Sequence, residues 1–220
     1  MRTTIASPAF WALLALLAPA CGDNPKQPPA EETAATEPAV GSIAIDFSIE
    51  PGKRVGGIRA DASESDVENL YGADQVQFRS VYIGEGESQP GVAVFPNTPN
   101  ELEIVWDIAA ATGKPEFIRA SKEGTAWHTV QGVTVGTTLE ELERINGGPF
   151  SIYGFGWDYG GLVTDWQGGK LRPYLIVALT PGKPELVGPE VSGDRAFSSG
   201  DPHIRAIEPR VGSMVITFER

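Results

Sequence analysis

The sequence predicts an α+β fold made of two related units, each a short helix followed by an antiparallel β-meander. Three observations lead to this prediction: two short helical segments with matching spacing, several runs of strand length after each helix, and turn-forming residues between those runs. We place the first unit at residues 43–127 and the second at residues 128–220.

The first 20 residues have the features of a cleavable export signal. Arg2 precedes an apolar stretch at residues 10–17, and the small residues 18–20 lead to Cys21. The apolar stretch is shorter than the roughly 20 residues that span a bilayer. We therefore expect a signal peptide at residues 1–20 rather than a retained membrane helix.

Cys21 stands where a lipidated cysteine would stand. Residues 18–21 resemble the lipobox of bacterial lipoproteins, with Ala18 where leucine is more usual. The resemblance implies a membrane attachment through a lipid on Cys21, as in a palmitate-bearing lipoprotein. Because Ala18 and Ala20 also suit ordinary signal peptidase, a soluble periplasmic product is the alternative. Gly22 gives no clear retention signal, and we favour the outer over the inner membrane.

Cysteine and charge exclude several kinds of chemistry. Cys21 is the only cysteine, so the chain has no intrachain disulfide and no thiolate metal cluster. Arg2 is the only charged residue of the leader, which leaves 16 basic and 29 acidic residues and a balance of −13. Because phosphate binding needs a basic surface, we expect no nucleic-acid partner.

The folded body is expected to begin after a tether. Residues 21–42 are the predicted lipid anchor and flexible linker, rich in Pro, Glu, Ala and Thr and without apolar periodicity. From residue 43 onward, four apolar residues alternate with small or polar ones, which predicts a half-buried strand. These residues are Ile43, Ile45, Phe47 and Ile49.

Two helices are predicted from an internal repeat with an offset of 75 positions. The hydroxyl, acidic, apolar and glycine residues that follow Gly57-Ile58 recur at the same spacing after Gly132-Val133. The first helix lies between Ser63 and Gly72, and the second between Thr138 and Gly147. The hydroxyl residue begins each helix, with an acid three residues on forming a capping box, which we expect to be better in the second. A glycine in the left-handed conformation ends each helix.

Each helix is expected to bury a pair of apolar residues three positions apart against a sheet. The pairs are Val67 with Leu70, and Leu142 with Ile145.

Eight further strands follow from apolar or alternating runs separated by turn residues. A long loop at residues 181–209 is expected before the last of them. The predicted strands are residues 76–83, 92–95, 102–106, 117–120, 150–157, 162–166, 174–179 and 214–218.

Three motifs resemble a family of uncharacterised bacterial lipoproteins across most of residues 55–180. They are the spacing from Gly57-Ile58 to Tyr71-Gly72, the run Val133-x-x-Gly136-Thr137-x-Leu139-x-x-Leu142, and the block from Gly154 to Gly161. At the level of architecture, the chain is also similar to β-lactamase inhibitor protein and to the small lipoproteins that assist outer-membrane β-barrel assembly. This resemblance implies a fold, and fold does not imply function.

The densest aromatic feature is the segment 150–161. On an extended strand, Tyr153, Phe155, Trp157 and Tyr159 would share one face. That face could be a binding platform, with Asp158 beside the rings as a hydrogen-bond acceptor. Alternatively, it could be the core of the second unit. We favour the core, because exposed apolar patches are uncommon on monomeric proteins.

The binding candidates are a short set taken from this segment and from the end of the next strand. They are Tyr153, Trp157, Asp158, Tyr159 and Trp166.

Catalytic and metal signatures are missing from the sequence. His128 and His203 lie outside any catalytic motif, and no nucleophile elbow or metal-binding pattern is present. We expect no cofactor, no metal and no catalytic residue. A glycan hydrolase that uses two of Asp107, Asp158 and Asp165 as acid and base is the enzymatic alternative.

The function expected from the sequence is that of an exported cell-envelope lipoprotein. Its lipid anchor and aromatic segment favour a non-enzymatic module that binds a protein or a glycan. A glycan hydrolase and an envelope structural or inhibitor protein remain as alternatives.

Overall fold

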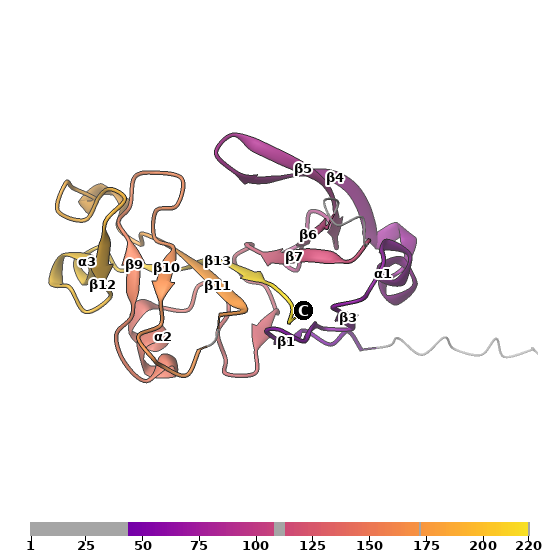
Figure 1. The fold of residues 1–220 in the computed structure, drawn as a ribbon, viewed down its shortest axis with the longest axis horizontal. Coiled ribbons are helices and arrows are strands. Elements are labelled where there is room, and N and C mark those ends of the chain that lie inside the picture. Colours follow the sequence, from indigo (N-terminus) through magenta and orange to yellow (C-terminus); the bar gives the residue numbers. More distant parts are fainter. Residues whose placement is uncertain (1–43, 108–112, 172, 220) are drawn as a thin grey trace, which may run out of the picture. The chain divides into compact units, whose positions relative to one another are not determined.

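The structure analysed is a computed structural model that describes residues 44–107, 113–171 and 173–219. The predictions for residues 1–42, including the lipid on Cys21, lie outside the described residues. Residues from Ile43 to Arg220 form one unit. The unit is of the α+β class, as predicted, and its described residues form three short helices and three β-sheets (Figure 1).

The largest sheet has six strands and is antiparallel throughout. Two strands that follow residue 174 lie beside four strands that precede residue 121 in this sheet. In spatial order the strands are β11 (Leu175–Thr180), β13 (Arg210–Ile216), β7 (Pro115–Ala120), β6 (Leu102–Trp106), β5 (Glu87–Val94) and β4 (Val76–Gly84).

Two smaller sheets complete the fold. One has the order β3 (Ile58–Arg59), β2 (Arg54–Val55), β1 (Ser48–Glu50) and β8 (His128–Thr129), in which β1 and β8 are parallel. The other has the order β10 (Val163–Asp165), β9 (Ser151–Tyr153) and β12 (Ala196–Ser198). The helices are α1 (Glu64–Tyr71), α2 (Leu139–Asn146) and α3 (Pro202–Ala206), with 3₁₀ turns η1 (Ala73–Gln75) and η2 (Pro184–Leu186).

The strands do not divide between two repeated units. Strand β13 pairs with β11 on one side and with β7 on the other, so Met214 lies opposite both Val177 and Ala120. After α2 the chain contributes β9 and β10 to one sheet and β11 to another. One core runs through all three sheets and contacts every helix. The two-unit repeat is therefore not shown, although α1 and α2 lie where the repeat placed them.

Both main helices begin and end where the sequence predicts. Ser63 caps α1 and Thr138 caps α2, and Gly72 and Gly147 follow their last residues. Gly147 takes the left-handed conformation, as expected, whereas Gly72 has a positive φ of 93° with ψ of 137°, outside the left-handed helical region.

The capping boxes differ from the prediction. In α1 the Ser63 N–H donates to Asp66 Oδ2 at 2.8 Å, and the Asp66 N–H donates to Ser63 Oγ at 3.2 Å. In α2 the Glu141 N–H donates to Thr138 Oγ1 at 3.3 Å, but the Glu141 carboxylate lies 3.5 Å from Arg144. The expectation that α2 has the better box is wrong, because Arg144 in the next turn attracts the carboxylate.

Only one helix buries its predicted apolar pair. Leu142 and Ile145 are buried on α2, whereas on α1 Val67 is buried and Leu70 is 49% exposed. The paired burial of Val67 and Leu70 is therefore wrong, and a single fully buried side chain anchors α1 to the core.

Other sequence-based boundaries also change: β5 begins at Glu87, before the predicted residue 92, and β9 covers only Ser151–Tyr153 of the predicted 150–157. The strand predicted from residue 43 is short: Ile45 is 42% exposed, and only Ser48–Glu50 pair as β1. The segment 181–209, predicted as a loop, contains η2, β12 and α3. Strand β12 was missed because three residues are too few to show an alternating pattern.

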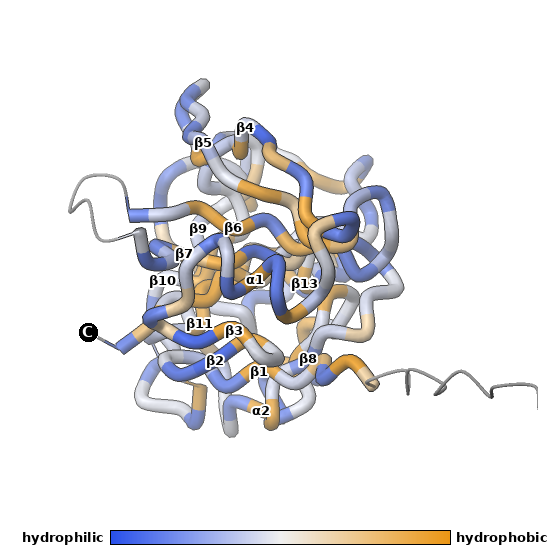
Figure 2. The backbone as a smooth tube through the Cα atoms, turned by 90° about the vertical axis from the view of Figure 1, so that its right-hand side faces the viewer, coloured by the Kyte–Doolittle hydropathy of each residue, from blue (hydrophilic) through white to orange (hydrophobic). Residues whose placement is uncertain are grey.

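The β4–β5 hairpin projects from the six-stranded sheet (Figures 1 and 2). Its turn is Glu85-Gly86, with φ angles of 52° and 79°. Positive φ at both central residues is typical of the tight turn that suits a twisted hairpin. The end of this hairpin is hydrophilic, whereas much of β6 and of the strands near it is apolar (Figure 2).

Candidate functional site

The aromatic segment does not continue as a strand beyond Tyr153. The Gly154 N–H donates to Arg195 O at 3.1 Å, and the Phe155 N–H donates to Val191 O at 2.8 Å. A Cβ on Gly154 would lie only 2.7 Å from Gly193 O, so the glycine permits this close approach. A loop therefore lies against the bare backbone here.

The alternation predicted for the four aromatic residues is consequently wrong. Phe155 is buried in the core, whereas Trp157 is 36% and Tyr159 is 38% exposed. Gly156 has a φ of +86°, a conformation that glycine adopts readily, and the chain turns there. The segment thus contributes one ring to the core and leaves its neighbours at the surface.

Three rings pack together in what we call the aromatic cluster: Tyr153, Trp157 and Tyr159. The Tyr153 and Trp157 ring centroids are 5.2 Å apart at an interplanar angle of 71°, and those of Trp157 and Tyr159 are 5.3 Å apart at 72°. Edge-to-face contacts of this kind are favourable beyond the area that they bury. Trp157 Nε1 also donates to Gly154 O at 2.9 Å. The exposed rings are therefore held in a fixed arrangement.

The hairpin end supports the aromatic cluster from a distant part of the chain. Tyr159 Oη donates to Glu85 Oε1 at 3.1 Å, and Gly84 lies beside the Tyr159 ring. The hydrogen bond to Glu85 is the main cause that raises the pKa of Tyr159 above its ordinary value, with smaller effects from burial and from the charges of Glu85 and Asp158. The site thus combines the loop after β9 with the β4–β5 turn.

Sequence reasoning missed the role of Glu85, which is 74 residues from Tyr159 in the chain. In the sequence, Glu85 stands out only as part of the turn Gly84-Glu85-Gly86 and as one of several acids that could in principle belong to a carboxylate pair or a calcium site. A local pattern cannot place that turn beside a loop of another sheet, so no sequence signal links the two residues.

The remaining binding candidates lie in different surroundings. Asp158 is exposed between Trp157 and Tyr159, on the same loop. Trp166 is half-buried, and its ring lies 5.2 Å from that of the core residue Phe150. The structure brings Tyr153, Trp157, Asp158 and Tyr159 together and packs Trp166 against the core.

The acids of the hydrolase hypothesis lie on different elements. Asp107 is buried at the end of β6, in the six-stranded sheet. Asp165 is exposed at the end of β10, in the three-stranded sheet, and Asp158 lies in the loop between β9 and β10. A glycosidase needs two carboxyl groups about 5–10 Å apart across a cleft. Their placement on separate elements gives no support to such a pair.

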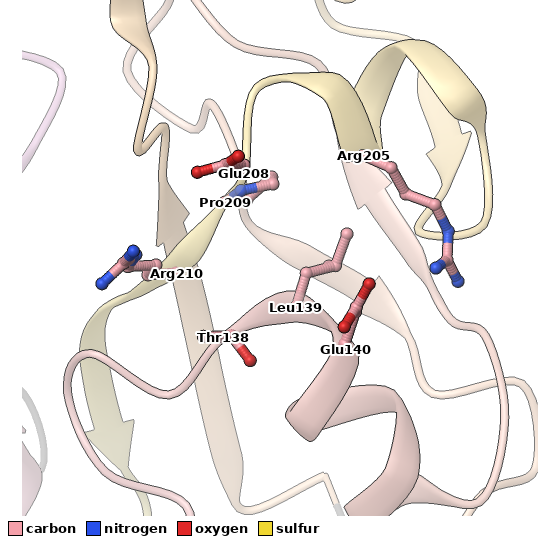
Figure 3. Close-up of a pocket in the computed structure, with 7 residues that line it drawn as sticks. All are labelled: Thr138, Leu139, Glu140, Arg205, Glu208, Pro209 and Arg210. Carbon is pink, nitrogen blue, oxygen red and sulfur yellow. The ribbon is translucent and has the colours of Figure 1, made fainter.

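A pocket of about 260 Å³ lies elsewhere, between α2, α3 and β13 (Figure 3). Glu140 and Leu139 line it from α2, Arg205 from α3, and Glu208 and Arg210 from the chain that enters β13.

Two of the four charged side chains that line this pocket form ion pairs within the protein. Arg205 forms an ion pair with Glu143, and Glu208 forms one with Lys183 at 2.7 Å. With two acidic and two basic residues in its lining, the pocket has no excess of one charge that would select a ligand.

Metal-binding and membrane-spanning features were sought in the described part of the chain. Residues 44–107, 113–171 and 173–219 hold no group of three or more His, Cys, Asp or Glu side chains placed to bind a metal ion. Within the same residues, no helix has the length and apolar character needed to cross a membrane. His128 and His203 are both exposed.

Comparisons with protein-family models, with curated proteins and with solved structures find no significant match to this chain. The resemblances to bacterial lipoproteins therefore stay predictions. Fold and surface together define an α+β protein with a preformed cluster of exposed aromatic residues.

Proposed function

We propose that this chain is an exported lipoprotein of the bacterial cell envelope, anchored through a lipid on Cys21, that binds an envelope protein without catalysing a reaction. The observation that carries the proposal is the aromatic cluster, in which the exposed Trp157 and Tyr159 rings are held by Gly154 and Glu85. A fixed aromatic surface loses little conformational entropy when it binds.

The ring geometry favours a protein over a carbohydrate as partner. A sugar stacks on a flat face, whereas the rings of the aromatic cluster stand at 71° and 72° to one another. Tryptophan and tyrosine are the residues that dominate many protein interfaces. The carboxylates of Glu85 and Asp158 next to the rings complement a basic residue of a partner.

A glycan is the second candidate ligand. It is favoured by the exposed Asp158, which can accept hydrogen bonds from sugar hydroxyl groups beside the Trp157 ring. A glycan hydrolase would need a carboxylate pair in addition. An envelope structural or inhibitor protein would form a stable complex and would differ from the proposal mainly in its partner.

The test is a Trp157→Ala variant in an envelope pull-down, compared with the unmodified chain. We expect Trp157→Ala to weaken partner capture by about 30-fold, because central aromatic residues of interfaces typically contribute about 2 kcal/mol or more. Leu186→Ala is the matched control, since Leu186 is an exposed apolar residue at 47% outside the cluster. Thermal unfolding of each variant checks that the fold is retained.

Three outcomes separate the candidates. Loss of a protein partner in Trp157→Ala alone supports the proposal. Equal capture by Trp157→Ala and Leu186→Ala overturns it. Retention of the unmodified chain on a glycan array, with loss in Asp158→Asn, would replace the protein partner by a carbohydrate.

A further inference from the structure

Strand β4 forms one edge of the six-stranded sheet. It is nine residues long and pairs with β5 on its inner side. Among the described residues, no strand pairs with its outer side. An edge of this length presents a row of main-chain donors and acceptors that another strand can satisfy.

The side chains of β4 do not protect this edge. Phe78 is 72% and Tyr82 is 49% exposed, on the same face of the strand. The strand has no proline and no lysine, the residues that commonly block edge pairing. Its single charged residue, Arg79, is neutralised by Glu101, with 2.8 Å between Nη1 and Oε1. Exposed aromatic residues therefore accompany an open edge of low net charge.

We propose that β4 pairs with β4 of a second copy of this chain, forming an antiparallel, two-fold symmetric dimer. Val76–Gly84 has Ser80 at its centre. The register that pairs all nine positions therefore places Ser80 opposite Ser80 of the second copy and Phe78 opposite Tyr82, twice per dimer. Aromatic cross-strand pairs are among the favourable pairs in antiparallel sheets.

The same register avoids repulsion between like charges. Arg79 lies opposite Val81 of the second copy, so the two guanidinium groups are not paired with each other. The Tyr82 carbonyl already accepts from Arg119 Nη2 at 2.8 Å, but a carbonyl oxygen has a second lone pair. A second copy thus matches this edge in length and in aromatic pairing, and the register places no like charges opposite each other.

This dimer uses β4 and not the loop after β9, although Gly84, the last residue of the strand, lies beside the Tyr159 ring of the aromatic cluster. The dimer brings together two chains that each carry a formal net charge of −12. Salt screens such long-range repulsion, so self-association is expected to strengthen as ionic strength rises.

Disulfide trapping tests the register in the full chain carrying Cys21→Ser, in which an introduced cysteine is the only thiol. Directly opposite residues of an antiparallel pair have Cα atoms about 4.5 or 5.5 Å apart, which suits a disulfide. Ser80→Cys is expected to form a covalent dimer under mild oxidation. Gln77→Cys is the matched control, because the two Gln77 positions lie roughly 20 Å apart in this register.

Sedimentation velocity provides a second, independent measurement on the same full chain. Ser80→Lys places two ammonium groups opposite each other, and we expect it to weaken self-association at least roughly tenfold, as does Phe78→Ala. Both residues are exposed, so thermal unfolding should change little. A chain that stays monomeric at high salt and at its highest soluble concentration overturns the dimer. Equal trapping at positions 77 and 80 also overturns it.

Discussion

Tyr159 shows how one side chain connects two distant elements. Its hydroxyl donates to Glu85 on the hairpin end, and its ring packs against Trp157. The hydrogen bond requires the protonated phenol, because a phenolate has no proton to donate to a carboxylate. The exposed surface of the aromatic cluster therefore depends on the ionisation state of this residue.

We predict that Glu85→Gln lowers the pKa of Tyr159 toward its ordinary value of about 10. The Glu85 carboxylate raises the pKa of Tyr159 in the folded state. The hydrogen bond therefore stabilises the fold fully at pH values below the pKa that Tyr159 has in the unfolded chain. This stabilisation is lost as the pH rises through the folded-state pKa. The measurement is a titration of the tyrosine Cζ resonance by ¹³C NMR, with Tyr159→Phe to assign the signal. Glu87→Gln, on the same hairpin, is the control. An unchanged midpoint in Glu85→Gln would contradict the contact.

At the residue scale, the sequence identified the exposed rings but not what holds them. Trp157 and Tyr159 are conspicuous in the sequence because aromatic residues are dense there. Phe155 goes to the core because the segment 191–193 pairs with its backbone, and that contact joins residues about 36 positions apart. Burial of one ring among four is thus decided by a non-local contact that no periodicity encodes.

At the scale of elements, Glu101 fixes the connection between β5 and β6 to β4. Its carboxylate accepts from the Asn97 N–H at 2.7 Å and from Arg79 Nη1 at 2.8 Å, and Lys122 lies 3.4 Å away. Burial by itself raises the pKa of Glu101, but these hydrogen bonds and positive charges outweigh burial and leave the pKa below its ordinary value.

We predict that Glu101→Gln destabilises the fold by about 2 kcal/mol at neutral pH, because it weakens charged hydrogen bonds at a buried position. The lowered pKa means that the carboxylate stabilises the fold above its unfolded-state pKa, and that this effect is lost as pH falls through the lower folded-state value. Urea unfolding at several pH values measures the difference, which should shrink below about pH 4. The exposed Glu116→Gln on β7 serves as control, and an equal loss there would contradict the prediction.

The helices were predictable because their signals are local. Ser63 and Gly72 lie within ten residues of each other, as do Thr138 and Gly147, and capping depends on neighbours in the sequence. Strand β6 was predicted with its observed limits because four of its five residues are apolar, with only Glu103 between them, and turn residues precede it. Strand β9 ends early because its neighbour β12 is only three residues long. The tertiary structure decides which strand pairs with β9, so the end of β9 could not be predicted from its own residues.

For the whole molecule, the proposed anchor determines where the aromatic cluster operates. A lipid on Cys21 would place the unit from Ile43 onward near a membrane surface, joined to it by the intervening segment. Two-dimensional confinement raises the effective concentration of copies and of envelope partners. The proposed anchor would therefore favour both binding at the aromatic cluster and pairing at the β4 edge.

We predict that the full chain incorporates radiolabelled palmitate in a bacterial host and that Cys21→Ser does not. The membrane fraction should retain the unmodified chain and release the variant, because lipidation supplies the attachment. Ala18→Leu is the control that strengthens the lipobox and should retain the label. Labelling of Cys21→Ser would place the lipid elsewhere, and a soluble, unlabelled chain would favour the periplasmic alternative.

Strand β13 gives the chain a late folding step. It spans Arg210–Ile216, the last strand of the sequence, yet it lies between β11 and β7 inside the largest sheet. Until the ribosome has synthesised these residues, no strand connects β7 to β11. The core also lacks Met214 and Ile216 until then. Long-range strand pairing of this kind forms slowly. The six-stranded sheet therefore cannot close until residues 210–216 have been synthesised.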